Sequence, residues 1–189
     1  MVVLMLAAGY GWAQQRGFPG QKPGVPGSFP PGDQMEVFLE LAGIPGESTD
    51  GAHKDNIDVL GFSFGASQPS VSGSTAGANA KTEFQPLKVI KKVDRASPRL
   101  FTACASGELI KKAVLVVRRG GRGNEFLKYI LSDLVVSGIK QTLNQGGGVR
   151  EEMDLSYGKV EIEYSTESPD GKGSGIVKGG WDLRANKRL

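Results

Sequence analysis

Residues 53–65, HKDNIDVLGFSFG, contain the residue types and spacing closest to those of an active site. Gly61, Ser63 and Gly65 match the G-x-S-x-G pattern that exposes a serine nucleophile on a sharp strand-to-helix turn. His53, the only histidine of the chain, precedes them. A serine activated by an imidazole could attack an acyl group.

The order of these residues argues against a hydrolase. In the α/β-hydrolase fold the acid and then the histidine follow the serine, whereas no histidine follows Ser63 here. Ser63 also continues an alternating strand pattern instead of opening a helix, and His53 lies in a polar turn, where an exposed loop histidine is expected. The sequence therefore predicts that Ser63 is part of a strand and not a nucleophile.

Three further motifs lack the context that their chemistry needs. Ser137 and Lys140 fit S-x-x-K, but they end a strand pattern, whereas the β-lactamase motif opens a helix and needs partners that are missing. Residues 118–123, RRGGRG, resemble a single RGG element without interleaved aromatic residues, at a place where a hairpin needs a turn. Gly171-Lys172 lacks the spacing of a phosphate-cradling loop. We expect no nucleic-acid or phosphate site.

Metal and thiol chemistry are not predicted either. Acidic residues crowd one loop at Glu47, Asp50, Asp55 and Asp58, but their spacing is not that of an EF-hand, and a single histidine is available for a transition metal. Cys104 is the only cysteine, so it forms no intrachain disulfide, and its small apolar neighbours indicate a buried side chain. We expect no catalytic residue, no metal and no cofactor.

Composition predicts a globular, all-β protein. Of the 189 residues 39% are apolar and 23% charged, and the 28 glycines and 10 prolines favour short strands and turns over long helices. A net charge of +3 arises from 23 basic and 20 acidic residues, which indicates a mixed surface and gives no reason to expect nucleic acid. No apolar run approaches the roughly 20 residues of a membrane span, so membrane insertion is not expected.

Residues 1–34 differ from the rest of the chain. The apolar run VVLMLAA at 2–8, followed by Gly11 and Ala13 at the positions that a signal peptidase reads, predicts a signal peptide over 1–13. The absence of Lys and Arg before this run leaves a frayed apolar tail as the alternative. Residues 14–34 hold five prolines spaced irregularly by glycines, which predicts an extended arm or linker but excludes a collagen helix.

From residue 35 to 189 a period of two predicts strands. In residues 35–41 the apolar Met35, Val37, Leu39 and Leu41 alternate with a set that includes Glu36 and Glu40. Runs apolar on both faces at 114–117 and 125–137 predict central strands. In residues 153–164 the apolar phase slips by one residue at Gly158-Lys159, which predicts a β-bulge there.

One short helix is predicted between Ser97 and Gly107. Ser97 is expected to cap it, Pro98 to open it and Gly107 to end it, with Leu100, Phe101 and Cys104 sharing one face. The segment from 65 to 83, rich in Gly, Ser and Ala, is longer than the roughly 12 to 15 residues beyond which a connection usually has a function.

From Met35 to about Lys187 the chain resembles the haemolysin-coregulated protein family, which forms the tube of type VI secretion systems. No single motif is diagnostic of this family, but the order and spacing of several motifs along the chain are specific to it. The motifs are Gly46-Glu47-Ser48, His53 with Ile57-Asp58-Val59-Leu60, Phe62-Ser63-Phe64-Gly65, the small-residue loop at 65–83, Ser97-Pro98-Arg99-Leu100, Ala103-Cys104-Ala105-Ser106-Gly107, Val160-Glu161-Ile162-Glu163-Tyr164 and Gly180-Trp181-Asp182-Leu183-Arg184-Ala185-Asn186.

The resemblance implies a β-barrel of two sheets with one flanking helix, assembling as six-membered rings that stack into a hollow tube, without enzymatic activity. It implies that the long loop contacts the next ring, through candidates Gly65, Gln68, Pro69, Val71, Ser74, Asn79 and Lys81. With Leu60, Phe62 and Phe64 filling the barrel, Val59, Gly61 and Ser63 are expected to face the lumen. The expected partners are further copies of the chain and effector proteins in the lumen.

The signal-like start and the arm depart from that family. They suggest an exported homologue that passes through the periplasm and polymerises outside the inner membrane, its arm bracing neighbouring subunits through Phe18, Pro19, Val25 and Phe29. The alternative is a conventional inner-tube protein that is cytoplasmic before type VI export, delivers effectors and has no signal peptide.

Overall fold

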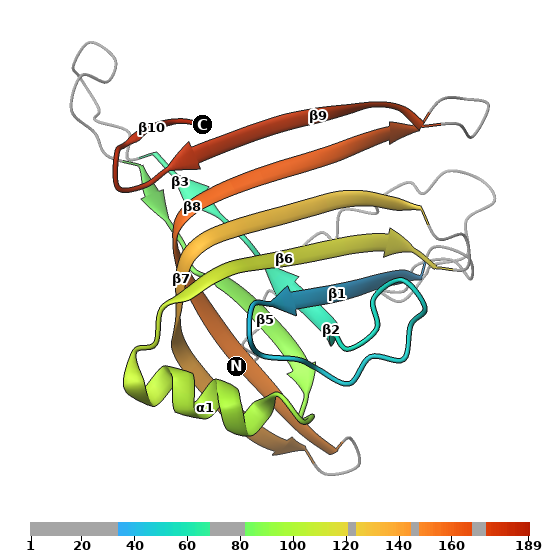
Figure 1. Ribbon diagram of the computed structural model, residues 1–189, viewed down its shortest axis with the longest axis vertical. Helices are drawn as coiled ribbons and strands as arrows, with labels where there is room; N and C mark the ends of the chain where they lie inside the picture. Colours follow the sequence, from blue (N-terminus) through green and yellow to red (C-terminus); the bar gives the residue numbers. More distant parts are fainter. Residues whose placement is uncertain (1–33, 69–81, 121–123, 145–147, 168–172) are drawn as a thin grey trace, which may run out of the picture.

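The computed structural model describes residues 34–68, 82–120, 124–144, 148–167 and 173–189. These residues form ten strands and one helix (Figure 1). In chain order the elements are β1 (Met35–Leu41), β2 (Ile57–Ser63), β3 (Ala66–Ser67), β4 (Glu83–Phe84), β5 (Leu87–Lys92), α1 (Ser97–Ser106), β6 (Ile110–Arg119), β7 (Glu125–Asn144), β8 (Gly148–Glu167), β9 (Gly173–Asp182) and β10 (Lys187–Arg188). The prediction of an all-β protein with one short helix is confirmed.

The strands close into a barrel. The main sheet has the order β10-β9-β8-β5-β2-β1-β6-β7, and β7 also pairs with β8, which closes a ring of six strands. The first half of β8 pairs with β5 and its second half with β9, so the long hairpin of β7 and β8 links the two layers of the barrel (Figure 1). A separate two-stranded ribbon, β3 with β4, stands beside it. This is the barrel that the sequence predicts, its two sheets continuous through one hairpin.

Alternating apolar side chains fill the barrel. Leu39 and Leu41 of β1 point inward as the period of two predicts, and α1 packs against β7 through Leu100 and Ala103. The fully enclosed side chains come from every strand of the closed ring, including Leu39, Ile57, Leu87, Val89, Leu115, Leu131, Leu134, Met153 and Leu155. A continuous core of this kind gives the barrel a single rigid shape.

The start of α1 differs from the prediction that Ser97 caps it. Ala96 occupies the cap position without a side-chain hydrogen bond, and Ser97 already lies in the first turn. Asp94 performs part of the capping, because its Oδ1 accepts a hydrogen bond from the Ala96 amide at 2.9 Å. The other end agrees with prediction, since Gly107 ends the helix with φ +64, in the left-handed region that favours glycine.

The face assignment of β2 was wrong for two residues. The pairing of β2 with β5 shifts between Val59 and Gly61, so one extra residue, Leu60, is inserted there. Val59 is therefore part of the core at 9% exposure, whereas Leu60 is 52% exposed. Phe62 packs partly buried against the core as expected, and Ser63 is exposed. Val59 is thus excluded as a lumen-facing residue.

The predicted phase slip after Tyr157 is present, but its cause is not a β-bulge. Tyr157 and Val160 are both buried, and the pairing with β7 keeps one register through this region. Both strands turn together, with Asp133 of β7 at φ 54. The pairing shift between the two strands lies further along, between Val136 and Gly138.

Candidate assembly surfaces

His53 and Ser63 do not form a catalytic pair. His53 is buried, at 7% exposure, and its ring stacks on Phe38 with 4.4 Å between centroids. Its Nε2 lies 3.1 Å from Glu125 Oε1, out of line for a hydrogen bond, and its Nδ1 lies 3.4 Å from the side-chain amide of Asn56. These contacts fix the loop before β2, and the expectation of an exposed loop histidine was wrong.

Arg118 binds the same loop, and its guanidinium is therefore engaged within the fold and not available as part of an RGG motif. Its guanidinium donates to both carboxylate oxygens of Asp50, at 3.1 and 2.6 Å, and its Nε donates to Glu36 at 2.8 Å. The plane also lies over the Phe38 ring, 4.9 Å from the centroid. Hydrogen bonding to Arg118 is the main cause that lowers the pKa of Asp50 to about 2. Asp50 is therefore a structural anion and not a metal ligand.

A buried ion pair joins α1 to the barrel. Lys91 and Glu151 are both fully buried, with 3.0 Å between Nζ and Oε1. Lys91 also lies 2.6 Å from Asp94 and donates to Ser97 Oγ at 3.0 Å, while Gln141 donates to the other oxygen of Glu151 at 2.6 Å. The fully buried Lys91 and Glu151 side chains both have partners, so the cluster positions α1.

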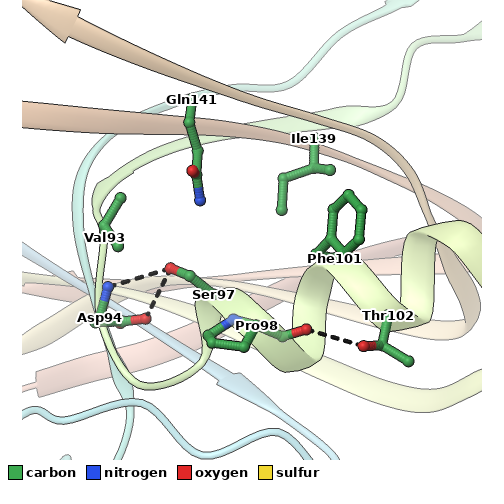
Figure 2. A pocket seen from close by; sticks show the side chains of 8 residues that line it. All are labelled: Val93, Asp94, Ser97, Pro98, Phe101, Thr102, Ile139 and Gln141. Carbon is green, nitrogen blue, oxygen red and sulfur yellow. Dashed lines mark hydrogen bonds between the residues drawn. The ribbon is translucent and has the colours of Figure 1, made fainter.

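An open groove of about 640 Å³ lies between α1 and β7, next to this cluster (Figure 2). Figure 2 shows Gln141 and Ile139 projecting toward the helix, with Phe101 rising beside Ile139. Leu100 is fully buried and Phe101 is 63% exposed, so the prediction that they share one face was wrong. Cys104 was predicted to be buried and is half-buried. The groove is lined by Val93, Asp94, Ser97, Pro98, Phe101, Thr102, Ile139 and Gln141.

The outer face of four neighbouring strands is small and polar. Ser63 of β2 lies opposite Lys88 of β5, which lies opposite Asp154 of β8, and the Lys88 and Asp154 side chains form an ion pair at 3.1 Å. Ser156 donates to Ser137 of β7 at 2.9 Å on the same surface. We call these five residues the polar face. It presents hydroxyls and one balanced ion pair, without a reactive group.

The long loop predicted to contact another ring begins and ends on the β3–β4 ribbon. The backbone N–H of Gln85 donates to the Gly65 carbonyl at 3.0 Å, and the Thr82 hydroxyl donates to Gln68 Oε1 at 2.5 Å. These two hydrogen bonds join the two ends of the loop. The other loop candidates, at Pro69, Val71, Ser74, Asn79 and Lys81, lie outside the described residues. So do the arm candidates Phe18, Pro19, Val25 and Phe29, and the expected signal peptide.

A second groove, of about 280 Å³, lies between the β3–β4 ribbon and the strands β8 and β9. Aromatic and aliphatic side chains line it, among them Phe64, Phe84, Ile162 and Trp181. We call it the Trp181 groove. No sequence motif predicted this groove, although the two glycines before Trp181, Gly179 and Gly180, are a usable signal. The Arg118 and Lys91 clusters were missed as well, because their partners are far apart in the sequence.

Within the described part of the chain, no group of three or more histidine, cysteine, aspartate or glutamate side chains is arranged to hold a metal ion. Among the same residues, no helix has the length and apolarity needed to cross a bilayer.

Comparison with known proteins gives one consistent result. Residues 38–164 match the family described as type VI secretion system effector, Hcp. The protein hcp1 of Pseudomonas aeruginosa is 35% identical over 158 residues, which cover 80% of this chain and 97% of that protein.

Solved structures agree. Hcp1 from Salmonella typhimurium is 36% identical, covers 82% of this chain and 99% of its own, and superposes with a TM-score of 0.70. A structure described as a type six secretion system protein is 31% identical, covers 82% of this chain and 100% of its own, and has a TM-score of 0.76. Sequence and fold together show that the chain belongs to the Hcp family of type VI secretion system proteins.

Proposed function

We propose that this protein is a structural subunit that binds copies of itself in six-membered rings, stacked or wound into a hollow tube. The observation that carries the proposal is membership of the Hcp family over about four fifths of the chain.

The polar face is the best candidate for the wall of the lumen. Ser63 and its neighbours carry hydroxyls and an ion pair of zero net charge, and such a surface lets a cargo protein pass without strong binding. Gly61, next to Ser63, is half-buried and adds no side chain. Effector proteins are the proposed cargo.

The loop that starts at Gly65 is proposed to reach the next ring. Its base is held by the short β3–β4 ribbon and by the contact of Thr82 with Gln68, so it has a firm origin on the barrel. Gly65 and Gln68 lie at this base, and the remaining candidates lie on the part that would extend toward the neighbour.

Electron microscopy of the purified full-length chain over rising concentration tests the proposal. We expect rings with a central hole and, at higher concentration, tubes. A chain that stays monomeric at every concentration would contradict it.

A labelling experiment tests the lumen. In a Cys104→Ser background, a Ser63→Cys thiol should react with a bulky maleimide much more slowly in tubes than in dispersed subunits. A matched cysteine at Thr102, on exposed α1, is the control for reactivity in general. Equal protection at both positions would contradict a lumen role for the polar face.

We further propose that residues 1–13 are removed on export and that the chain polymerises outside the inner membrane. The apolar run followed by small residues supports this, and the Pro/Gly-rich arm then becomes the mature N-terminus. Mass spectrometry of the native protein decides between the two routes. An intact Met1 in a cytoplasmic fraction would favour the conventional inner tube that is exported by the type VI machine itself.

A further inference from the structure

The Trp181 groove has the shape of a receptor for an apolar segment. Trp181 and Gly179 of β9 lie opposite Val160 and Ile162 of β8 in the strand register. These four positions are therefore on the same face of the β8–β9 pair. Phe84 of the β3–β4 ribbon lines the facing wall.

Gly179 keeps this groove open. A side chain at this position would meet no atom within 4 Å, and its backbone is not in the left-handed region. The missing side chain therefore leaves the apolar surface of Ile162, directly opposite, uncovered. An open apolar surface of this kind on a β-ribbon is a docking site for another segment.

Trp181 gives independent evidence of a missing partner. Its indole Nε1 is buried and has no hydrogen-bond acceptor among the described residues. A buried indole N–H normally has an acceptor, because leaving one unsatisfied is costly. A segment that brings a backbone carbonyl oxygen to this indole would remove that cost.

Composition distinguishes the two segments of this chain that could reach the groove. Residues 69–81 contain one larger aliphatic residue, Val71, among small and polar ones. Residues 14–33 contain Phe18, Val25 and Phe29 with five prolines. Extended proline-rich segments bind aromatic-lined grooves, and their backbone carbonyls are free to accept hydrogen bonds. The arm has the chemistry that the groove requires.

We propose that the Trp181 groove binds the Pro/Gly-rich arm, residues 14–33, of a second copy of this chain. This inference rests on the proposed self-assembly and names the site at which the arm acts.

The geometry of the barrel favours a second copy over the same chain. The arm joins the barrel at Gln34, whose carbonyl accepts a hydrogen bond from the Gly120 amide at 2.7 Å, where β1 begins and β6 ends. Trp181 is level with the other end of β1, because the register runs from Trp181 through Val160, Leu131 and Ala113 to Leu41. Six residues of strand separate the two levels, which is about 20 Å.

In an extended conformation a segment of this length spans about 60 Å. Because the arm joins β1 at the end opposite to the level of Trp181, an arm that continues the line of β1 leads away from its own groove and toward a neighbouring copy. The contact joins two different surfaces, and contacts of that type propagate from copy to copy.

Directed disulfide formation in the full-length chain tests the contact. Both partners carry Cys104→Ser. One carries Val25→Cys and a mass tag, and the other carries Ala66→Cys on β3, at the edge of the groove. After co-assembly and mild oxidation we expect a covalent dimer that contains one chain of each kind. Ser67→Cys in place of Ala66→Cys is the matched control, since Ser67 is the exposed neighbour of Ala66 on β3 and does not line the groove, and it should give little dimer.

Substitution of the arm sharpens the test. Adding Phe18→Ser and Phe29→Ser to the first chain removes two large apolar side chains, so we expect the dimer yield at limiting concentration to fall at least about tenfold. Unchanged yield would contradict recognition through these side chains.

The remaining outcomes separate this inference from the proposed function. Rings or tubes without the mixed dimer would overturn the arm contact and leave the tube intact. A single chain with both cysteines that closes on itself, with no mixed dimer, would overturn binding between copies. A mixed dimer without rings or tubes would support the contact and contradict the tube.

Discussion

The buried pair of Lys91 and Glu151 gives a sharp prediction about stability. Lys91→Met keeps an aliphatic stem in the same space but leaves the Glu151 carboxylate without its cation, 3.0 Å away, in a place with no exposure to solvent. Removing one partner of a buried pair costs about 3–5 kcal/mol. For a domain of this size that corresponds to a fall in Tm of about 6–20 °C.

Substitution of the other partner should lower the free energy of unfolding by less. Glu151→Gln leaves the Lys91 ammonium beside Asp94 at 2.6 Å, and the new amide keeps an oxygen that can accept from Ser97. We expect a loss of about 1–2 kcal/mol, as for an altered buried hydrogen bond. The asymmetry follows from the number of partners that each group retains.

Urea unfolding followed by circular dichroism measures both costs. All variants are compared at one low protein concentration, because association between copies raises the apparent stability. Lys92→Met is the matched control, since the Lys92 side chain is exposed, and its cost should be within about 0.5 kcal/mol. Equal costs for Lys91→Met and Lys92→Met, or for Lys91→Met and Glu151→Gln, would refute the reasoning.

Three further predictions follow from other contacts. A Cβ at Gly46 would lie 2.3 Å from a backbone carbonyl oxygen, so Gly46→Ala should cost at least about 1–3 kcal/mol by thermal unfolding, whereas Gly51→Ala, in open space, should be nearly neutral. Arg118 lowers the pKa of Asp50 from 3.8 to about 2, so the Asp50 carboxylate stabilises the fold above pH 4. The difference in Tm between the protein and its Asp50→Asn variant should therefore be full at pH 7 and shrink as the pH falls from 4 toward 2. A difference that stays constant would contradict the pairing. Tyr157→Phe should lower the free energy of unfolding by about 1 kcal/mol at pH 7, because a hydrogen bond to a backbone carbonyl is lost. Burial raises the pKa of Tyr157 from 10 to about 12, so the difference in stability between the protein and this variant should shrink as the pH rises above 10. A difference that grows there would exclude burial as the cause of the shift.

The parts of the fold that sequence predicted are those governed by local patterns. The alternation in β1 identified Leu39 and Leu41 as core residues, and Gly107 ended α1 where a left-handed residue was needed. Both signals lie within a few neighbouring residues. Patterns of this kind are legible without knowledge of the tertiary structure.

The errors arose where a distant partner decides the outcome. An inserted residue at Leu60 becomes visible only through the pairing of β2 with β5, so the faces of Val59 and Leu60 were exchanged. Ser97 looked like a helix cap, but its hydroxyl serves the Lys91 and Glu151 cluster instead.

The assembly surfaces were predicted only in part. The polar face could be anticipated from Ser63 on its strand, but not from Lys88 or Asp154, whose adjacency depends on strand order. The Trp181 groove depends on the β3–β4 ribbon facing β8 and β9 across it, and no local pattern predicts such an arrangement. Buried ion pairs and grooves are tertiary features, so their residues become meaningful only when the strands are in place.

The long hairpin of β7 and β8 has a mechanical consequence. Because both strands turn at Asp133 without a change of register, the two layers of the barrel share covalent backbone as well as side-chain contacts. Sliding one layer over the other would have to bend two strands and break several of their mutual hydrogen bonds at once. The wall of an assembly made from such subunits should therefore resist shear within each subunit and yield first at the joints between them.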